Sequence, residues 1–374
     1  MKVYLDNAAT TPLDKEVLDA MLPVMENQFG NPSSIHAFGR QTRALIENSR
    51  KTVAKLLNAS PSEIFFTSGG TEADNMAIFG AVNDLGCVHA ITTKIEHHAV
   101  LHTMEALQKE GKIKLSYVNL LSNAGVDLQH LEELLKSNGK TLVSLMHANN
   151  EIGNLLPMQE VGELCKKYDA VFHSDTVQTM GHYAIDLQKV KIHFLICGAH
   201  KFHGPKGVGF IYVNGNVKVH PYIHGGSQER NMRGGTENLY GIVGLGKALE
   251  IAYRDLEAHQ KHIQEIKSYM IEQLKVAIPS VSFNGTSGES NSLYTVLSVN
   301  FPASSKSEML LFNLDIHHIC ASGGSACSSG ANAGSHVIRA INNNPDITTV
   351  RFSFSKHNTK NEIDVVVARL KEMI

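Results

Sequence analysis

The sequence carries almost no net charge, with 34 lysine and arginine residues against 36 aspartate and glutamate residues. There is no basic excess to indicate nucleic-acid binding and no acidic run to indicate a disordered tail. A run of about eighteen apolar residues is also missing, so we expect no membrane-spanning helix. The first residues, MKVYLDNAATTP, enter a strand pattern without the apolar stretch of a signal peptide. We therefore expect a cytoplasmic protein.

Cysteine is scarce as well. The five cysteines are odd in number, widely spaced and free of CxxC pairs, which argues against a disulfide framework and indicates free thiols in a reducing compartment. Cys87, Cys165 and Cys197 have the apolar surroundings of buried structural cysteines, whereas Cys320 is ambiguous. Cys327 lies in GSACSSG, where small residues predict an approachable thiol.

The sequence does contain a regular alternation of strand and helix patterns from about residue 15 to 215. Asp14 is placed to cap a first helix whose apolar positions fall on one face. The short apolar runs with strand character cover residues 64–67, 88–92, 115–118, 142–146, 170–173 and 194–197. Helical stretches separate the earlier of these runs, which predicts βαβ units and an α/β fold with a mainly parallel sheet covered by helices.

The last third of the chain has a different pattern. A long helical stretch covers about residues 238–276, and strand and helix patterns mix irregularly from about residue 279. We interpret this part as a smaller α+β C-terminal domain. The predicted division is a large domain at 15–256 and a small domain formed by 1–14 together with 257–374.

Ligands of open α/β sheets bind where the carboxyl ends of strands meet helix N-termini, so we looked for polar motifs there. The run at 64–67 is followed by Ser68-Gly69-Gly70-Thr71 and then by a helical pattern. Such a turn offers backbone N–H groups and a positive helix end to a phosphate. It is not a nucleotide P-loop, because no GK[ST] follows the glycines. A plain strand–helix turn capped by Thr71 explains it equally well.

Two further strand ends carry Asp175 and Lys201. Taken alone, Asp175 could be a helix cap, a metal ligand or the partner of a protonated ring nitrogen, and Lys201 could be an ordinary surface lysine. Together with the glycine turn they form the set needed to hold pyridoxal phosphate: a phosphate cradle, an acid for the ring nitrogen and a lysine for the Schiff base. Burial beside a cationic ring should lower the pKa of that lysine.

Histidine and arginine supply the remaining candidates. In EHHAV, His97 could stack on a cofactor ring and move protons. His200 and His203 could be two ligands of a zinc site, but no cysteine or carboxylate cluster completes such a site, so we expect no metal. Arg351 lies in an otherwise apolar strand, where it needs an anion. That anion could be a substrate carboxylate or the acid of a structural ion pair.

In their order and spacing, these segments resemble the NifS/IscS-like cysteine desulfurases, class V members of the fold-type I pyridoxal-phosphate enzymes. The resemblance covers nearly the whole chain. Its motifs are YLDNAATT, GNPSSIH, TSGGTEADN, EHHAV, MHANNEIG, SDTVQ, AHKFHGPKG, RGGTEN, GSACSSG and VRFSFS.

The resemblance implies a role for each cofactor-binding residue. Lys201 would form the Schiff base and shuttle protons. The remaining contacts would come from His97 stacked on the ring, Asp175 at the ring nitrogen, Asn150 and Gln178 at the phenolic oxygen, and Gly70, Thr71 and His200 at the phosphate. Thr236 would reach the phosphate of the partner subunit, because the family works as a homodimer with its sites at the interface.

The resemblance also implies the reaction. Arg351, with Asn31, would bind the carboxylate of L-cysteine, and Cys327 would attack its sulfur. The products would be L-alanine and a Cys327 persulfide, which passes to an acceptor such as an iron–sulfur scaffold or a tRNA-thiolation protein. GSACSSG resembles the group I pattern with its longer loop.

The sequence departs from the family pattern in three places. Gly198 replaces the usual serine two residues before His200, which removes one hydroxyl contact to the phosphate. The usual triple glycine region reads GGSQERN, with Ser227 and Asn231 changed, and ANAG at 331–334 replaces the commoner run after Cys327. The last change leaves the identity of the acceptor open.

Two alternatives stay open on the sequence. Selenocysteine lyase, cysteine-sulfinate desulfinase or class V aminotransferase activity would use the same fold, although an aminotransferase has no need of the loop thiol. A catalytically weak assembly scaffold would explain Gly198 but not the presence of Lys201, His97, Cys327 and Arg351.

Overall fold

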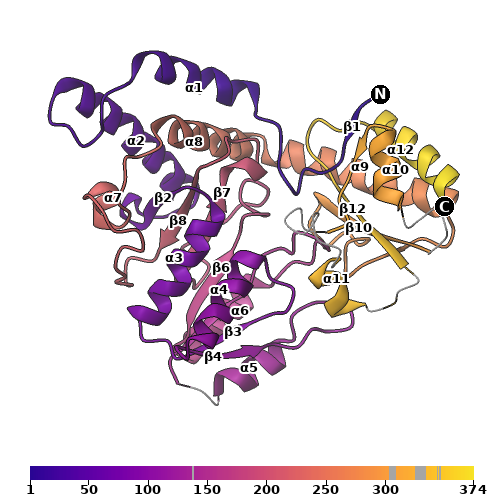
Figure 1. Cartoon of the computed structure of the whole chain (residues 1–374), viewed down its shortest axis with the longest axis horizontal. Helices are drawn as coiled ribbons and strands as arrows, with labels where there is room; N and C mark the ends of the chain where they lie inside the picture. Colours follow the sequence, from indigo (N-terminus) through magenta and orange to yellow (C-terminus); the bar gives the residue numbers. More distant parts are fainter. Residues whose placement is uncertain (137–138, 303–308, 325–333, 343, 345–346) are drawn as a thin grey trace.

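The computed structural model describes residues 1–136, 139–302, 309–324, 334–342, 344 and 347–374 (Figure 1). Its central feature is a seven-stranded sheet with the order β2-β8-β7-β6-β5-β3-β4. All neighbouring pairs are parallel except those of β8, which runs antiparallel to β2 and β7. The strands are β2 (Ile64–Thr67), β3 (His89–Thr92), β4 (Lys114–Tyr117), β5 (Thr141–Ser144), β6 (Val171–Asp175), β7 (Phe194–Gly198) and β8 (Gly209–Val213).

Helices cover both faces of this sheet, which is why most of its strands are buried along their whole length. One core cluster joins the sheet to helices on one face, and a second joins it to helices on the other. The first face carries α2 (Ala37–Leu56), α5 (Leu128–Lys136), α6 (Met158–Lys167) and α8 (Leu239–Arg254), and the second carries α3 (Gly70–Asn83) and α4 (His98–Lys109). The predicted α/β fold with a mainly parallel, helix-covered sheet is confirmed.

A separate core lies beside the large sheet, on the right in Figure 1. It combines Val3 and Leu5 with residues between 263 and 374, around an antiparallel sheet of order β12-β10-β9 and a parallel pair β1-β11. Its elements are β1 (Val3–Tyr4), α9 (Leu256–Ala277), β9 (Ser282–Phe283), β10 (Val296–Pro302), α10 (Leu310–Ile316), β11 (Ile319–Cys320), β12 (Ile347–Ser353) and α12 (Lys360–Met373). Helix α11 (His336–Ile341) packs elsewhere, in a small cluster with Ile95, Ala124 and Ile152. The domain boundaries at 14/15 and 256/257 stay a prediction, supported by this grouping.

Two predicted helices differ in detail. The stretch at 238–276 is divided between α8 and α9, because Asp255 leaves helical geometry with φ −106° and ψ 15°. A one-residue break of this kind does not disturb the apolar periodicity from which the helix was predicted.

No helix in the described ranges is long and apolar enough to cross a membrane.

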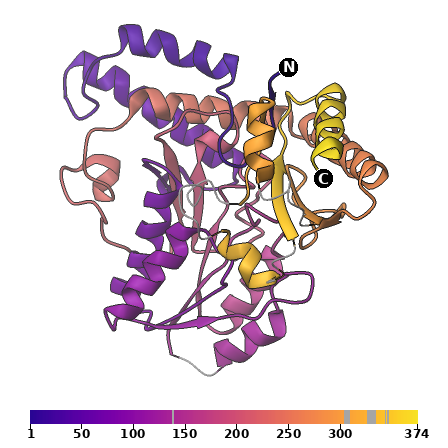
Figure 2. The same ribbon diagram turned by 45° about the vertical axis from the view of Figure 1, so that its right-hand side comes forward.

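The first helix, α1 (Lys15–Asn27), begins at the predicted cap, where Asp14 accepts a hydrogen bond from the Glu16 N–H. Only part of its apolar face is covered by the rest of the chain, however, since Val17 is buried and Met21 packs against the core of the large sheet. Leu18, Leu22 and Met25 are 40–51% exposed. Figures 1 and 2 show α1 along the outer edge of the molecule. The periodicity therefore predicted the helix correctly but not what its apolar side contacts.

Candidate active site

Five strands of the large sheet deliver side chains to a single cavity of about 230 Å³. Each chain segment enters it just beyond a strand's carboxyl end, as the parallel topology requires. The lining residues are Ala8, Ala9, Gly70, Thr71, Asp74, His97, Met146, Asn150, Asp175, Val177, Gln178, His200, Lys201 and Arg351. Nine residues proposed from the sequence are thus brought together: Gly70, Thr71, His97, Asn150, Asp175, Gln178, His200, Lys201 and Arg351.

Lys201 lies in a short 3-10 turn directly after β7. Its Nζ donates hydrogen bonds to the carbonyl oxygens of Ala8, at 2.5 Å, and Ala9, at 2.8 Å. Gln178 donates its Nε2 to the same Ala8 oxygen at 3.1 Å. The N-terminal segment therefore holds the lysine amine at the cavity. Its motif YLDNAATT supported the family resemblance, but no role was predicted for it.

Asp175 and His97 lie together at another end of the cavity. Asp175 ends β6 and accepts a hydrogen bond from the Val177 N–H at 2.8 Å. His97 caps α4, and its Nδ1 accepts the Ala99 N–H at 3.2 Å, which leaves Nε2 for a ligand. Burial lowers the pKa of His97 and raises that of Asp175, a rise that the nearby His97 opposes. A neutral imidazole beside a buried acid can move a proton and can stack on a flat ring.

The N-terminus of α3 forms the phosphate end of the cavity. Gly70 and Thr71 open this helix, and His200 faces them from the turn after β7. The Nδ1 of His200 lies 3.2 Å from the Thr10 hydroxyl, whereas the Nδ1 of His203 turns to the Pro12 carbonyl at 2.9 Å. These two histidines thus have separate partners. The helix end, the acid and the amine fit pyridoxal phosphate in the arrangement expected from the sequence.

The Gly198 departure leaves space for a side chain at this end. A Cβ built on Gly198 would lie 3.6 Å from the Gly70 nitrogen and from Val177, which is ordinary contact. The backbone is extended, with φ −129° and ψ 116°, so a serine would cause no strain. Its hydroxyl would lie close to the phosphate cradle.

We expect Gly198→Ser to bind pyridoxal phosphate about fivefold more tightly, because one added hydrogen bond is worth about 1 kcal/mol. The dissociation constant is to be measured by absorbance titration of cofactor-free protein. Gly198→Ala is the matched control, since it adds the Cβ without the hydroxyl and should stay within about twofold of the wild type. Equal affinities for the serine and alanine variants would contradict the hydroxyl contact.

Arg351 enters the cavity from β12, and the structure contains the ion pair that was one of its two interpretations from the sequence. Its side chain is 2% exposed, and Nη2 pairs with Asp6 at 2.7 Å while Nη1 donates to the Asn150 carbonyl at 3.0 Å. Its Nε is buried without a hydrogen-bond partner. The guanidinium is therefore held in place by an acid, and its binding of a substrate carboxylate stays a prediction.

Two proposed residues are not among those that line this cavity. Asn31 is exposed in the segment between α1 and α2. Thr236 is exposed beside a different cavity of about 140 Å³, with Ser68 and Arg233. If these two residues serve an active site, they must serve the site of another copy. Cys327 lies outside the described residues.

Acidic residues near Asp175 were not singled out from the sequence. Asp74 lines the cavity, and Glu96 is buried next to His97. The signal for Asp74 was its place near the start of α3, two residues after Glu72, which pairs with Arg233. That spacing turns the two carboxyls to different sides of a helix.

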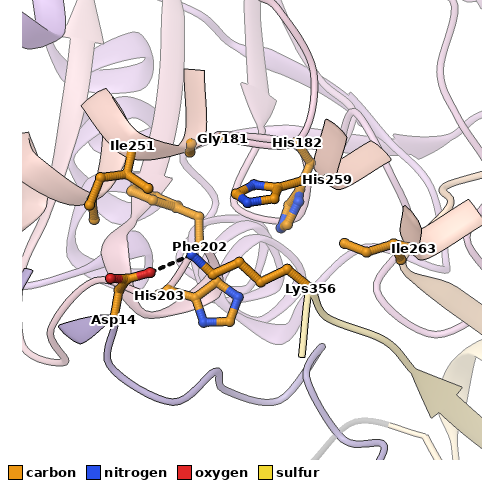
Figure 3. Close-up of a pocket in the computed structure, with 11 residues that line it drawn as sticks. Asp14, Gly181, His182, Phe202, His203, Ile251, His259, Ile263 and Lys356 are labelled. Carbon is orange, nitrogen blue, oxygen red and sulfur yellow. Dashed lines mark hydrogen bonds and ion pairs between the residues drawn. The ribbon is translucent and has the colours of Figure 1, made fainter. Parts of the chain in front are cut away.

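A smaller cavity of about 20 Å³ lies behind Lys201, between the two cores (Figure 3). His182, His203 and His259 face it, and Asp14 forms an ion pair with Lys356 across it. The His182 Nε2 lies 3.1 Å from the Lys201 carbonyl oxygen. Burial lowers the pKa of His182 to about 4 and that of His203 to about 3. The lysine turn thus rests on uncharged histidines.

Acid should therefore destabilise the fold. Histidine pKa values that are lowered by folding give stability that is complete above the ordinary value of 6.5 and is lost as the pH falls toward 4. For His182 and His203 together, we expect the free energy of unfolding to drop by about 3 kcal/mol between pH 7.5 and 5. Urea unfolding across this range measures it. His182→Gln should reduce the drop, and an unchanged drop in that variant would contradict its assignment.

The chain is similar to known proteins along its whole length. The chain matches the class-V aminotransferase family over residues 3–366. The cysteine desulfurase IscS of Dictyoglomus turgidum is 43% identical over 377 residues, covering 100% of this chain and 94% of that protein. A solved NifS-like protein has a TM-score of 0.91 at 37% identity, covering 100% of this chain and 99% of the other. SspA in complex with cysteine has a TM-score of 0.82 at 32% identity, covering 96% and 100%. The chain therefore belongs to the class-V aminotransferase family, in the group of the IscS-type cysteine desulfurases.

Proposed function

We propose that this protein converts L-cysteine and the Cys327 thiol into L-alanine and a Cys327 persulfide, using pyridoxal phosphate. The observation that carries the proposal is the meeting of Lys201, Asp175, His97 and Arg351 in one cavity. In the balanced reaction the carbon–sulfur bond of cysteine breaks, a sulfur–sulfur bond forms and the released carbon takes a proton.

Each residue at the cavity then has a task. The cofactor, when bound, supplies an electron-accepting ring, and the family depends on it. Lys201 would supply the amine that holds it and would move protons at the cavity. Asp175 would face the ring nitrogen, His97 would stack on the ring, and Gln178 and Asn150 would reach its phenolic oxygen. Gly70, Thr71 and His200 would hold the phosphate.

Arg351 would receive the substrate carboxylate. Its Nη atoms are fixed by Asp6 and by the Asn150 carbonyl, so the guanidinium would meet the carboxylate as a cation held in place at the cavity wall. A fixed guanidinium of this kind favours the binding of an anion. The solved complex of SspA with cysteine supports cysteine as the substrate class.

The described residues before and after Cys327 lie next to Glu151. The Ser335 hydroxyl donates a hydrogen bond to Glu151, and Gly324 lies so close to Glu151 that a Cβ would be 2.8 Å from its carboxylate. Glu151 directly follows Asn150, which lines the cavity. Cys327 is three residues from Gly324, and three residues reach at most about 11 Å. This reach supports attack by the Cys327 thiol on sulfur held in the cavity.

A homodimer is supported by the uncovered apolar surface of the first two helices. Phe29 is 74% exposed, Ile35 91% and Phe38 50%, beside the exposed face of α1. Patches of this kind usually mark a protein interface. A second copy bound there would bury them, and would also bring Asn31 and Thr236 of the partner subunit to the cavity.

The persulfide needs a recipient. The relatives named IscS support a cytoplasmic role in which sulfur passes to an iron–sulfur scaffold or a tRNA-thiolation protein. The protein's Cys327 persulfide is the form in which sulfur would be handed on, since a thiol of the acceptor can attack it directly.

The test is to measure alanine and sulfide made from L-cysteine with added pyridoxal phosphate and a thiol reductant. Equal yields of the two products support the proposal. Amino-group exchange or pyruvate without sulfide would assign the protein to aminotransferase chemistry. Parallel assays with selenocysteine and cysteine sulfinate decide between the sister activities.

A further inference from the structure

Two buried polar atoms at the floor of the cavity face each other without a hydrogen bond of normal geometry. They are Oδ1 of Asp74, on α3, and Nε2 of His173, on β6. The atoms are 3.3 Å apart, and the residues are 1% and 0% exposed. On the far side of the ring, Nδ1 of His173 lies 2.7 Å from the Ser144 hydroxyl. Because a buried unpaired polar group is costly, this pair requires an explanation.

Asp74 shares its surroundings with two other buried carboxyls. One oxygen of Asp74, one of Asp175 and a ring nitrogen of His97 all lie within 4.8 Å of one another. Glu96 is also buried nearby: its charge raises the pKa of Asp74, and the charge of Asp175 raises the pKa of Glu96. Carboxylates this close cannot all be ionised in a low-dielectric interior, so at least one must hold a proton.

The three acids differ in their partners. Asp175 accepts the Val177 N–H and faces the basic groups of His97 and Lys201. Glu96 accepts the Met146 N–H at 3.0 Å and the Thr93 hydroxyl at 3.3 Å.

Asp74 has no comparable support. Burial, Asp175 and Glu96 all raise its pKa, which lies well above the usual range. Burial also lowers the pKa of His173 to about 3, so that ring is neutral.

We propose that Asp74 is a neutral carboxylic acid that donates a hydrogen bond from Oδ1 to the Nε2 of His173, so that Asp175 alone carries the negative charge at the floor of the cavity. The inference rests on the proposed function, in which Asp175 faces the ring nitrogen. A proton on Oδ1 occupies the gap between the two unpaired atoms. His173 then donates from Nδ1 to Ser144, and every polar atom of the chain Asp74–His173–Ser144 has a partner.

Asp74 is thereby a positioning residue. A second negative charge beside Asp175 would raise the pKa of Asp175 and would weaken its hold on a protonated ring nitrogen. It would also repel an anionic substrate. A neutral acid at this point avoids both effects while it fills the space between α3 and β6.

The test compares infrared spectra of the cofactor-loaded wild type, Asp74→Asn and Asp175→Asn at pH 7.5. We expect a protonated-carboxyl band that is lost in Asp74→Asn and kept in Asp175→Asn. A band from Glu96, whose pKa burial raises to about 8, remains in all three. We also expect Asp74→Asn to bind the cofactor within about threefold of the wild type, and Asp175→Asn at least about tenfold more weakly.

Loss of the band in Asp175→Asn instead, or a tenfold loss of affinity in Asp74→Asn, would overturn the assignment. If Asp74→Asn does not fold, His173→Gln provides the second measurement. In His173→Gln the protonated-carboxyl band of Asp74 must shift, because the acceptor of the Asp74 hydrogen bond changes from a ring nitrogen to an amide. An unshifted band overturns the proposal. A wild type that binds no pyridoxal phosphate would refute the proposed function, whereas the band of Asp74 could still be measured in that cofactor-free protein.

Discussion

Lys201→Ala is expected to lower alanine and sulfide formation from L-cysteine by at least about a thousandfold. Among the described residues, Lys201 supplies the only lysine amine that lines the main cavity. Without it, His97 remains as a proton carrier, but no amine is left there to exchange with the substrate amine. Product formation is to be measured at saturating cofactor, so that weakened cofactor binding does not account for the loss.

Lys206→Ala is the matched control. Lys206 belongs to the same AHKFHGPKG motif but is exposed and does not line the cavity. We expect its activity to stay within about twofold of the wild type. Far-ultraviolet circular dichroism of both variants checks the fold, because Lys201 also bonds to Ala8 and Ala9. Turnover above about a tenth of the wild-type rate in Lys201→Ala would contradict the proposed role of Lys201.

The central part of this site could be predicted from the sequence because parallel sheets concentrate function at one edge. Asp175 and Lys201 each follow an apolar run, and successive parallel strands end on the same side. β6 and β7 are indeed neighbours in the sheet. The glycine turn after β2 joins them because β8 alone lies between β2 and β7. Local patterns were sufficient for these residues.

Contacts between distant segments were not predictable in the same way. The ion pair of Arg351 with Asp6 spans 345 residues, so the strand pattern around Arg351 left its partner open. Asp74 was visible as an acid in a helix's first turn, but its proximity to His173 depends on how α3 packs on β6. Such packing is set by the whole core rather than by a local motif.

The apolar face of α1 marks a different kind of limit. Apolar residues at helical spacing predict that one face of a helix is buried, but they do not identify the surface that covers it. Leu18, Leu22 and Met25 satisfied the pattern and are nevertheless uncovered in the single chain. The same ambiguity applies to Asn31 and Thr236, whose predicted roles depend on a second copy.

Cys327→Ser should separate substrate binding from sulfur release. We expect L-cysteine still to change the absorbance of the bound cofactor, while sulfide release falls by at least about a thousandfold. A serine hydroxyl is a poor nucleophile toward sulfur and cannot store it as a persulfide. Alanine formation should fall in parallel, because the carbon–sulfur bond breaks only when a thiol takes the sulfur.

The other thiols make Cys320→Ser the matched control. Cys87, Cys165 and Cys197 are buried, and burial raises the pKa of each, to about 12 for Cys87. Cys320 is exposed, lies seven residues before Cys327 and is thus the one competitor within the described part of the chain. We expect Cys320→Ser to keep its activity. Retained sulfide release in Cys327→Ser, together with loss of sulfide release in Cys320→Ser, would indicate that Cys320 carries the persulfide. Because Cys320 pairs with Tyr4 in β1, sulfur transfer would then occur at the edge of the smaller core and not on the segment between Gly324 and Ser335.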